Sequence, residues 1–262
     1  MSPVPLPVLR QQIVACTRCP RLRAYCERVA REKKRAHRDE TYWGRPVPGF
    51  GDPAARLLIV GLAPAAHGAN RTGRMFTGDS SGDFLMAALH RAGFATIPTS
   101  RLAGDGLRLT DVFVAAAARC APPDNKPLPA ELDACYPWLR QEAAALPHLR
   151  VVVALGRIAF QTCRRLLHDA ALSPAGRPSF GHGARCEFSA AGAQRSPLRP
   201  RSGGPERDRG AEQGFGPAQE LTLIASYHPS RQNTNTRRLT PAMLDEVFSA
   251  VRAALGRGAT PA

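Results

Sequence analysis

The amino-acid sequence predicts an α/β protein in which helices cover both faces of a parallel sheet. Two observations support this fold class. Short runs of apolar residues recur along the chain, as expected of strands that are buried on both faces. Between these runs lie longer segments whose apolar residues follow helical spacing. Strands that alternate with helices in this way form parallel sheets, so we expect a three-layer α/β/α architecture.

Each element follows from a local pattern. Four apolar runs are the expected strands, at residues 57–61, 112–116, 151–155 and 221–225. A basic stretch at residues 8–40 is expected to form one or two helices. Further helices are expected from Asp79 to Gly93, over residues 129–146, from Gly156 through Leu167, and from Thr240 to Leu255. Capping residues support several of these boundaries: Asp79 and Thr240 are good N-caps, and Gly93 is a good helix terminator.

Residues 174–218 differ from the rest of the chain. They are rich in glycine, proline and arginine and contain no long apolar run. We therefore expect one domain over residues 1–262, with a disordered insertion at 174–218 that divides no core.

The composition indicates which class of binding partner to expect. Lys and Arg number 36 against 21 Asp and Glu, a formal net charge of +15, which favours a polyanion, with nucleic acid as the first candidate. No stretch approaches the ~18 consecutive apolar residues of a membrane helix. The N-terminus does not have the pattern of a secretory signal. We expect a protein that acts in the cytoplasm, where structural disulfides are rare.

Four of the seven cysteines suggest a metal centre. Cys16 and Cys19 form a CxxC, and Cys120 and Cys135 follow far downstream. Thiolates on short loops suit either zinc or an iron–sulfur cluster, and a redox thiol pair is the main alternative for a single CxxC. The spacing alone does not separate these possibilities. Cys26, Cys163 and Cys186 lie outside the pattern.

Three polar segments follow expected strands, at residues 63–79, 119–127 and 226–238. Ligands of parallel sheets bind at the carboxyl ends of the strands, so these segments are expected to meet in one crevice. His228, followed by Pro229, is well placed for chemistry, although it could also be an ordinary loop histidine. Phe76 lies among glycines and polar residues, where it is either a stacking platform or part of the core. The motifs of nucleotide triphosphate binding are absent from the sequence.

Taken together, these segments resemble the uracil-DNA glycosylase superfamily, and most closely its family 5, the iron–sulfur type of bacteria and archaea. The resemblance rests on GLAPAAHG at 61–68, RMFTGD at 74–79, RCAPPDNKP at 119–127 and YHPS at 227–230. Residues 174–218 match no part of it. The resemblance implies a four-stranded parallel sheet flanked by helices and a [4Fe–4S] cluster on Cys16, Cys19, Cys120 and Cys135.

The implied activity is DNA repair. The enzyme would flip uracil out of double-stranded or single-stranded DNA and hydrolyse the N-glycosidic bond, leaving an abasic site for base excision repair. By the resemblance, His228 contacts a carbonyl of uracil and Phe76 stacks on the base. The loop around Ala63, Ala65 and Ala66 would line the base pocket.

One departure from better-known relatives concerns the catalytic water. Those enzymes carry Asp where this chain has Ala63, so another residue must hold the water. Asn125 is the expected one, with Asn70 in reserve. Asp79 is an acidic alternative whose position also suits a helix N-cap.

Small side chains at Ala65, Ala66 and Ala116 predict a roomier pocket that also admits other deaminated bases such as hypoxanthine. Contacts to DNA are expected from Arg71, Arg74, Arg231, Gln232 and Asn233, the last two in the gap left by the flipped base. The alternatives are a non-catalytic iron–sulfur module that binds DNA and a hydrolase of small nucleotides. We expect a monomer that associates with the nucleoid when it acts on DNA.

Overall fold

The four expected strands form the centre of the sheet. The computed structural model describes residues 3–190 and 220–256. In it, β2 (Leu57–Gly61), β3 (Val112–Ala116), β4 (Val151–Leu155) and β7 (Leu221–Ser226) are parallel neighbours in the order β3-β2-β4-β7. The prediction of a parallel α/β core is therefore confirmed.

The sheet as a whole is larger and mixed. β1 (Phe50–Gly51) pairs antiparallel with β3 at one edge. At the other edge, β6 (Arg185–Ala190) pairs antiparallel with β7, and β5 (Leu172–Pro174) with β6. The sheet thus has seven strands in the described residues, where four were expected.

Part of the predicted insertion belongs to this sheet. The expectation of disorder over residues 174–218 is wrong up to Ala190, because β6 lies within that stretch. Phe188 is the only fully buried side chain of β6, so this edge strand has no apolar run by which to recognise it. Residues 191–218, the rest of the predicted insertion, lie outside the described residues.

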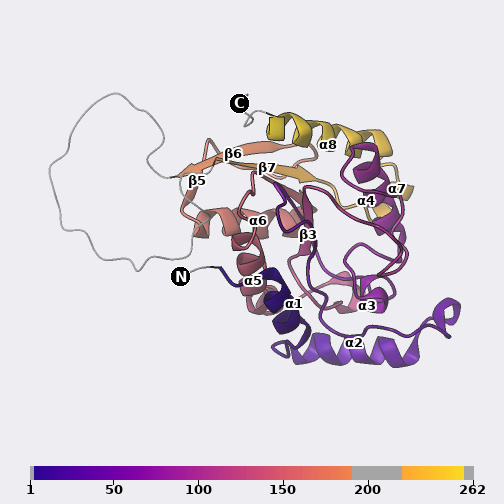
Figure 1. Ribbon diagram of the computed structural model, residues 1–262. Helices are drawn as coiled ribbons and strands as arrows, with labels where there is room; N and C mark the ends of the chain where they lie inside the picture. Colours follow the sequence, from indigo (N-terminus) through magenta and orange to yellow (C-terminus); the bar gives the residue numbers. More distant parts are fainter. Residues whose placement is uncertain (1–2, 191–219, 257–262) are drawn as a thin grey trace, which may run out of the picture.

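Helices cover both faces of the sheet (Figure 1). On one face, α4 (Ser80–Arg91) and α8 (Pro241–Gly256) pack against alternate strand residues such as Leu57 and Ile59. On the other, α5 (Pro129–Ala144) and α6 (Arg157–Asp169) pack against Leu58 and Val60. This alternation explains the continuous apolar runs, since a strand covered on both sides needs apolar side chains in every position. In the described part of the chain, no helix is long and apolar enough to cross a membrane.

The N-terminal basic stretch forms α1 (Leu6–Val14), α2 (Pro20–Glu32) and the 3-10 turn Arg35–His37. The CxxC separates the two helices, with Cys19 at the N-cap of α2 and Pro20 in its first turn, where proline is tolerated. These helices lie beside α5 and α3 in Figure 1. Ile13 of α1 packs against Trp138 of α5.

Three very short helices were not predicted: α3 (Ala69–Thr72), the 3-10 turn Pro123–Asn125 and α7 (Arg231–Asn235). Each lies within one of the polar segments that follow the strands. They are too short to show a helical apolar period, which explains why the sequence did not reveal them.

Candidate active site

The three polar segments converge on one cavity, as expected. The cavity has a volume of about 630 Å³ and lies at the carboxyl ends of the parallel strands. Its lining comes from all three segments and from the first turn of α4. The lining residues are Leu62, Ala63, Ala65, Ala69, Met75, Phe76, Asp79, Ser80, Ser81, Asp124, Asn125, His228, Ser230, Arg231 and Gln232.

His228 enters the cavity directly after β7. Its ring is nearly parallel to that of Phe76, with 5.9 Å between the ring centroids and 30° between the planes. The Asn233 side chain donates a hydrogen bond of 2.8 Å to the His228 carbonyl and so fixes the backbone. Burial lowers the pKa of His228 to about 4, so its imidazole is neutral at physiological pH. A neutral imidazole can donate one hydrogen bond to a ligand from its protonated nitrogen.

Phe76 is held in an unusual backbone conformation. Its φ is +48°, in the left-handed region that bulky side chains rarely adopt. The ring lies under the end of β2, where a Cβ added to Gly61 would come within 2.7 Å of it. Such strain persists only where the surroundings enforce it, and it is concentrated at functional sites. Phe76 is mostly buried, with 7% of its surface exposed; it belongs to the core and also lines the cavity.

Asn125 and Asp124 form an exposed turn at the cavity wall. Both have positive φ angles, 57° and 53°. Asn and Asp tolerate the left-handed region better than other non-glycine residues, which accounts for these residue types here. The structure therefore places Asn125 in the cavity, where a catalytic residue was expected.

Asp79 has two roles in the structure. Its carboxylate accepts a hydrogen bond of 2.9 Å from the Gly82 amide and caps α4, as the sequence suggested. It also lines the cavity, and burial raises the pKa of its carboxyl. Gly68 is required opposite it, because a Cβ there would meet the Asp79 carboxylate at 2.1 Å. The N-cap interpretation was thus correct but incomplete.

The small residues of the first loop divide between two hollows. Ala63 and Ala65 line the main cavity, whereas Ala66 lines only an adjoining hollow. Ala116 is buried at the end of β3 and lines neither.

Asn70 does not reach the cavity. It is fully buried, and its side-chain amide donates to the carbonyls of Cys26 and Ala66, each at 3.3 Å. It therefore holds the first loop against α2. This corrects the expectation that Asn70 could hold the catalytic water.

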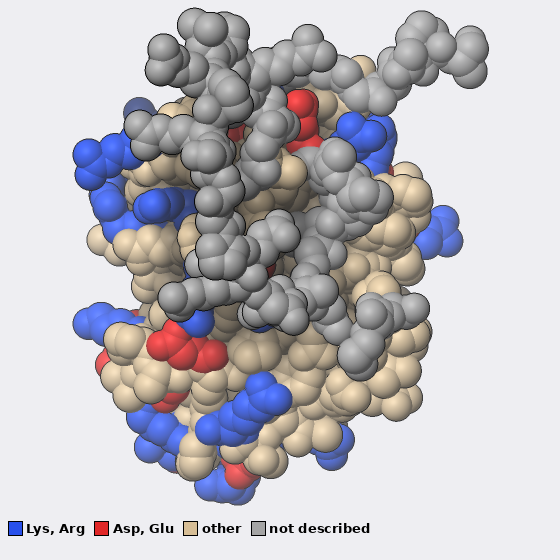
Figure 2. Space-filling view, turned by 90° about the vertical axis from the view of Figure 1, so that its left-hand side faces the viewer, with Lys and Arg blue, Asp and Glu red and all other residues tan. Residues whose placement is uncertain are grey.

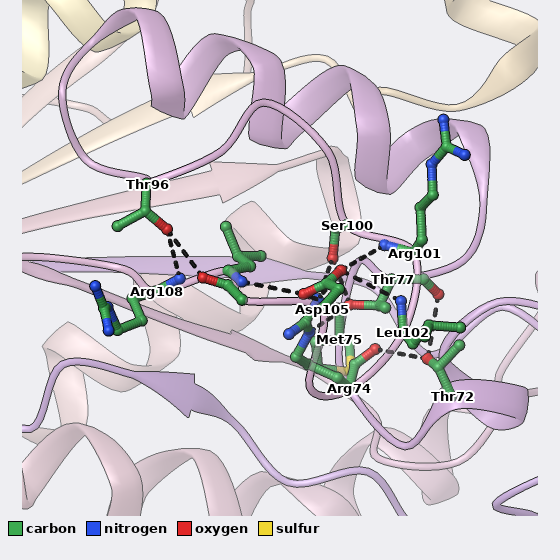
Figure 3. A network of polar contacts seen from close by, with 12 residues as sticks. Thr72, Arg74, Met75, Thr77, Thr96, Ser100, Arg101, Leu102, Asp105 and Arg108 are labelled. Carbon is green, nitrogen blue, oxygen red and sulfur yellow. Dashed lines mark hydrogen bonds and ion pairs between the residues drawn. The ribbon is translucent and has the colours of Figure 1, made fainter.

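Arg71 and Arg74 are also interior residues. Arg74 is 9% exposed and binds the Asp105 carboxylate at 2.8 Å, with further bonds to Thr77 and Ser100 (Figure 3). Arg71 is 6% exposed and pairs with Glu40. These partners occupy both guanidinium groups, so the expectation that they contact DNA phosphates is corrected. The sequence pattern could not reveal this, since it does not show which carboxylates fold next to them.

The residues that follow His228 also differ from one another: two are exposed to the cavity, and one is held by a hydrogen bond within the protein. Arg231 and Gln232 are exposed at the first turn of α7 and line the cavity. Asn233 is engaged by the His228 carbonyl, which makes it a positioning residue. Arg231 and Gln232 thus remain available to a ligand.

The four cysteines come together from three distant segments. Cys19 packs with Cys120, and Cys16 with Cys135. The Trp138 indole donates to the Cys16 sulfur at 3.4 Å, and the Arg119 amide donates to the Cys135 sulfur at 3.1 Å. Burial raises the pKa of Cys135 to about 12 and, together with Cys120, that of Cys19. In the described residues, no three His, Cys, Asp or Glu side chains form a site for a single metal ion.

The remaining cysteines differ in their surroundings. Cys163 is buried in the core between α6 and the sheet, and Cys186 lies on the edge strand β6. Cys26 was not expected near the other cysteines, yet it packs in the same buried cluster as Cys19 and Cys120.

Basic side chains are prominent on the described surface. Figure 2 shows lysine and arginine along one edge and the lower part of the side on which β5 lies, with fewer acidic side chains between them. This distribution agrees with the net charge of +15.

The structure defines the protein as one with a ligand cavity at the carboxyl ends of an α/β/α sheet, faced by a neutral histidine and an aromatic ring that suit a planar ligand. Residues 48–252 match the sequence profile of the Uracil DNA glycosylase superfamily. The chain belongs to this superfamily.

Its similarity extends over most of the chain. It is 50% identical over 238 residues to the type-5 uracil-DNA glycosylase of Thermus thermophilus, covering 91% of this chain and 93% of the relative. It is 48% identical over 241 residues to that of Mycobacterium tuberculosis, covering 92% and 78%. A type-4 uracil-DNA glycosylase of Pyrobaculum aerophilum is 34% identical over 127 residues, or 48% of this chain and 57% of the relative.

Proposed function

We propose that the protein is a uracil-DNA glycosylase of base excision repair, which hydrolyses the N-glycosidic bond of deoxyuridine in DNA and leaves an abasic site. The names of its type-5 relatives support this activity. The observation that carries the proposal is the neutral His228 beside Phe76 in a cavity large enough for a base. Because a base inside a duplex is out of reach, the nucleotide must first leave the stack.

His228 and Phe76 act on the base. As the bond breaks, negative charge develops on uracil, and the His228 N–H stabilises it at a carbonyl oxygen. One such donor in a dry site contributes about 3–4 kcal/mol to the transition state. Stacking on Phe76 contributes about 1–3 kcal/mol to holding the base.

Asn125 and Asp79 act on the sugar side. Both line the same cavity as His228, and the Ala63 side chain has no group that can hold water. The Asn125 amide can orient a water molecule, and the Asp79 carboxylate can accept its proton. The ionised carboxylate also stabilises the positive charge that develops on the sugar.

The pocket is proposed to accept a second base. Ala63 and Ala65 present only methyl groups to the cavity, which favours hypoxanthine as a further substrate. Excision from duplexes that contain either uracil or hypoxanthine tests this. Strict uracil specificity would contradict it.

We infer that Cys16, Cys19, Cys120 and Cys135 hold a [4Fe–4S] cluster. Two observations favour this fit: the four thiols gather from three segments, and two N–H groups already donate to their sulfurs. When bound, the cluster would supply cross-links between the N-terminal helices and the sheet.

The decisive experiment uses an end-labelled duplex with one deoxyuridine, followed by mild alkali. We expect cleavage at that position with the unaltered chain and with His148→Ala, an exposed histidine outside the cavity. We expect none with His228→Ala. A His228→Ala variant that binds but does not cut would exclude a purely DNA-binding role for the unaltered chain, whereas an inactive unaltered chain that binds DNA would favour that role.

We further propose that the chain works as a monomer in the cytoplasm, on chromosomal DNA. Size-exclusion chromatography on the full chain tests the first point. A dimer would contradict it.

A further inference from the structure

A second hollow adjoins the active-site cavity. It has a volume of about 470 Å³ and shares Ala65, Asp79, Asp124, Asn125 and Arg231 with the cavity. Its remaining wall includes Tyr25, Lys34 and His37, from α2 and the turn after it. These three residues precede residues 48–252, the part of the chain that matches the superfamily. This part of the wall therefore lies outside the matched region.

The hollow presents cations that have no partner among the described residues. Within the described residues, no carboxylate or carbonyl pairs with the Lys34 amino group or the Arg231 guanidinium, although both residues line the hollow. His67 also lines it, and the charges of Lys34, His37 and Arg71 contribute, after burial, to lowering the pKa of this imidazole.

Acidic groups are also present, but they do not neutralise these cations directly. Asp79 is half-buried, and its carboxylate is engaged by the Gly82 amide. Asp124 is exposed at the rim beside Asn125. Lys34 and Arg231 are thus left to bind an external anion.

The basic wall is fixed in place. The Tyr42 hydroxyl lies 3.0 Å from Nδ1 of His67 and accepts a bond of 3.3 Å from the Lys34 amide. Glu40 binds His37 at 2.6 Å and also pairs with Arg71, on the first loop. A wall held at several points loses little entropy when a ligand binds.

We propose that this hollow binds the phosphodiester next to the extruded nucleotide on the same DNA strand. The proposal rests on the proposed function, because it takes a nucleotide in the cavity as its starting point. Such a nucleotide carries a phosphate on each side of its sugar. The hollow offers unpaired cations directly beside the cavity, where one of these phosphates would pass.

The test measures binding of the full chain to duplexes that carry 2′-fluoro-deoxyuridine, which resists hydrolysis. In separate duplexes, the phosphate 5′ or 3′ to this nucleotide is replaced by an uncharged methylphosphonate. Each duplex is titrated with the unaltered chain, with Lys34→Ala and with Arg35→Ala. Arg35 is the matched control: it is exposed, lies in the same turn, and lines neither hollow.

We expect one methylphosphonate to weaken binding of the unaltered chain and of Arg35→Ala by about fivefold at low salt, as for an exposed ion pair. Lys34→Ala should bind the normal duplex more weakly than the unaltered chain does and lose less than the unaltered chain at that position, since the two changes remove the same ion pair and only the contact of Arg231 remains. The slope of log affinity against log salt should fall by about 0.9 for Lys34→Ala relative to the unaltered chain.

Equal sensitivity of all three proteins to both methylphosphonates would overturn the proposal. Uracil excision by the unaltered chain is measured in parallel. If the unaltered chain excises uracil but all three proteins are equally sensitive to the methylphosphonates, the phosphate site alone is refuted. If the unaltered chain does not excise uracil, the proposed function is refuted.

Discussion

At the scale of single residues, the site combines groups that each have a structural reason to be where they are. Asp79 caps a helix, Phe76 fills the space under Gly61, and Asn125 occupies a left-handed turn. Chemistry and architecture therefore share side chains. Substitutions that keep the architectural role can separate the two.

Asp79 offers such a separation. Asparagine is as good an N-cap as aspartate, and burial already disfavours the charged carboxyl. We expect Asp79→Asn to change the free energy of unfolding by less than about 0.5 kcal/mol, and Asp79→Ala to lower it by about 1 kcal/mol. Both should reduce the single-turnover excision rate by about 100-fold or more. Denaturant titration and excision assays measure these effects, and full activity of Asp79→Asn would remove the carboxylate from the mechanism.

His228 predicts a pH dependence. In the unfolded chain it takes up a proton near pH 6.5, but in the folded protein only near pH 4. Acid therefore favours the unfolded state. The contribution of this histidine is complete above about pH 6.5 and falls by about 1.4 kcal/mol per pH unit down to pH 4.

Denaturant unfolding of the unaltered chain and of His228→Asn between pH 4 and 7 measures this contribution. The unaltered chain should lose stability more steeply with acid. Its excision rate should not fall at pH 6, where an ordinary histidine would become charged. Parallel stability curves for the two proteins would show that His228 is not desolvated.

At the scale of elements, the loops are held by polar contacts around a half-buried carboxylate. Asp105 accepts hydrogen bonds from Arg74 and from the amides of Arg101, Leu102 and Leu107 (Figure 3). It thereby joins residues 100–107 to the polar segment at residues 63–79, which contains Arg74.

Asp105→Asn should disrupt this junction. An amide offers N–H groups where four donors need an acceptor, so we expect a loss of about 2–3 kcal/mol in the free energy of unfolding. Asp245→Asn is the matched control, because it breaks an exposed pair with Arg91 and should cost less than about 1 kcal/mol. Similar midpoints for the two variants in a urea titration would contradict a structural role for Asp105.

The elements that bury many apolar side chains were predicted from the sequence, and those that bury few were not. The four central strands and the long helices have continuous or periodic apolar patterns, and all were found. β5 and β6 lie at an edge with few buried residues, so their pattern resembled that of an insertion. Likewise, the motifs located His228, Phe76 and Asn125, but the burial of Arg71 and Arg74 depends on Glu40 and Asp105, which only the fold brings near.

At the scale of the whole molecule, the cysteines join parts of the chain that are distant in sequence. The Cys16–Cys19 junction connects α1 and α2, and it meets Cys120 after β3 and Cys135 in α5. The wall that carries Lys34 extends from α2. The integrity of the cysteine cluster should therefore affect how this wall is presented to DNA.

Cys120→Ser should abolish bound iron and lower the melting temperature. Cys186→Ser, on the edge strand, should retain both the iron and the melting temperature of the unaltered chain. Iron analysis and thermal unfolding measure these outcomes. Iron retained at full stoichiometry in Cys120→Ser would exclude this residue as a ligand.

The pairing of β6 with β7 has a consequence for how the protein can vary. Phe188 lies opposite Leu221, so the chain leaves the sheet and returns to it at adjacent points. The entropy of closing a loop rises only with the logarithm of its length, so the number of residues between these points has little effect on folding. This edge of the sheet is thus a place where the length of the chain can change between related proteins with little effect on the fold.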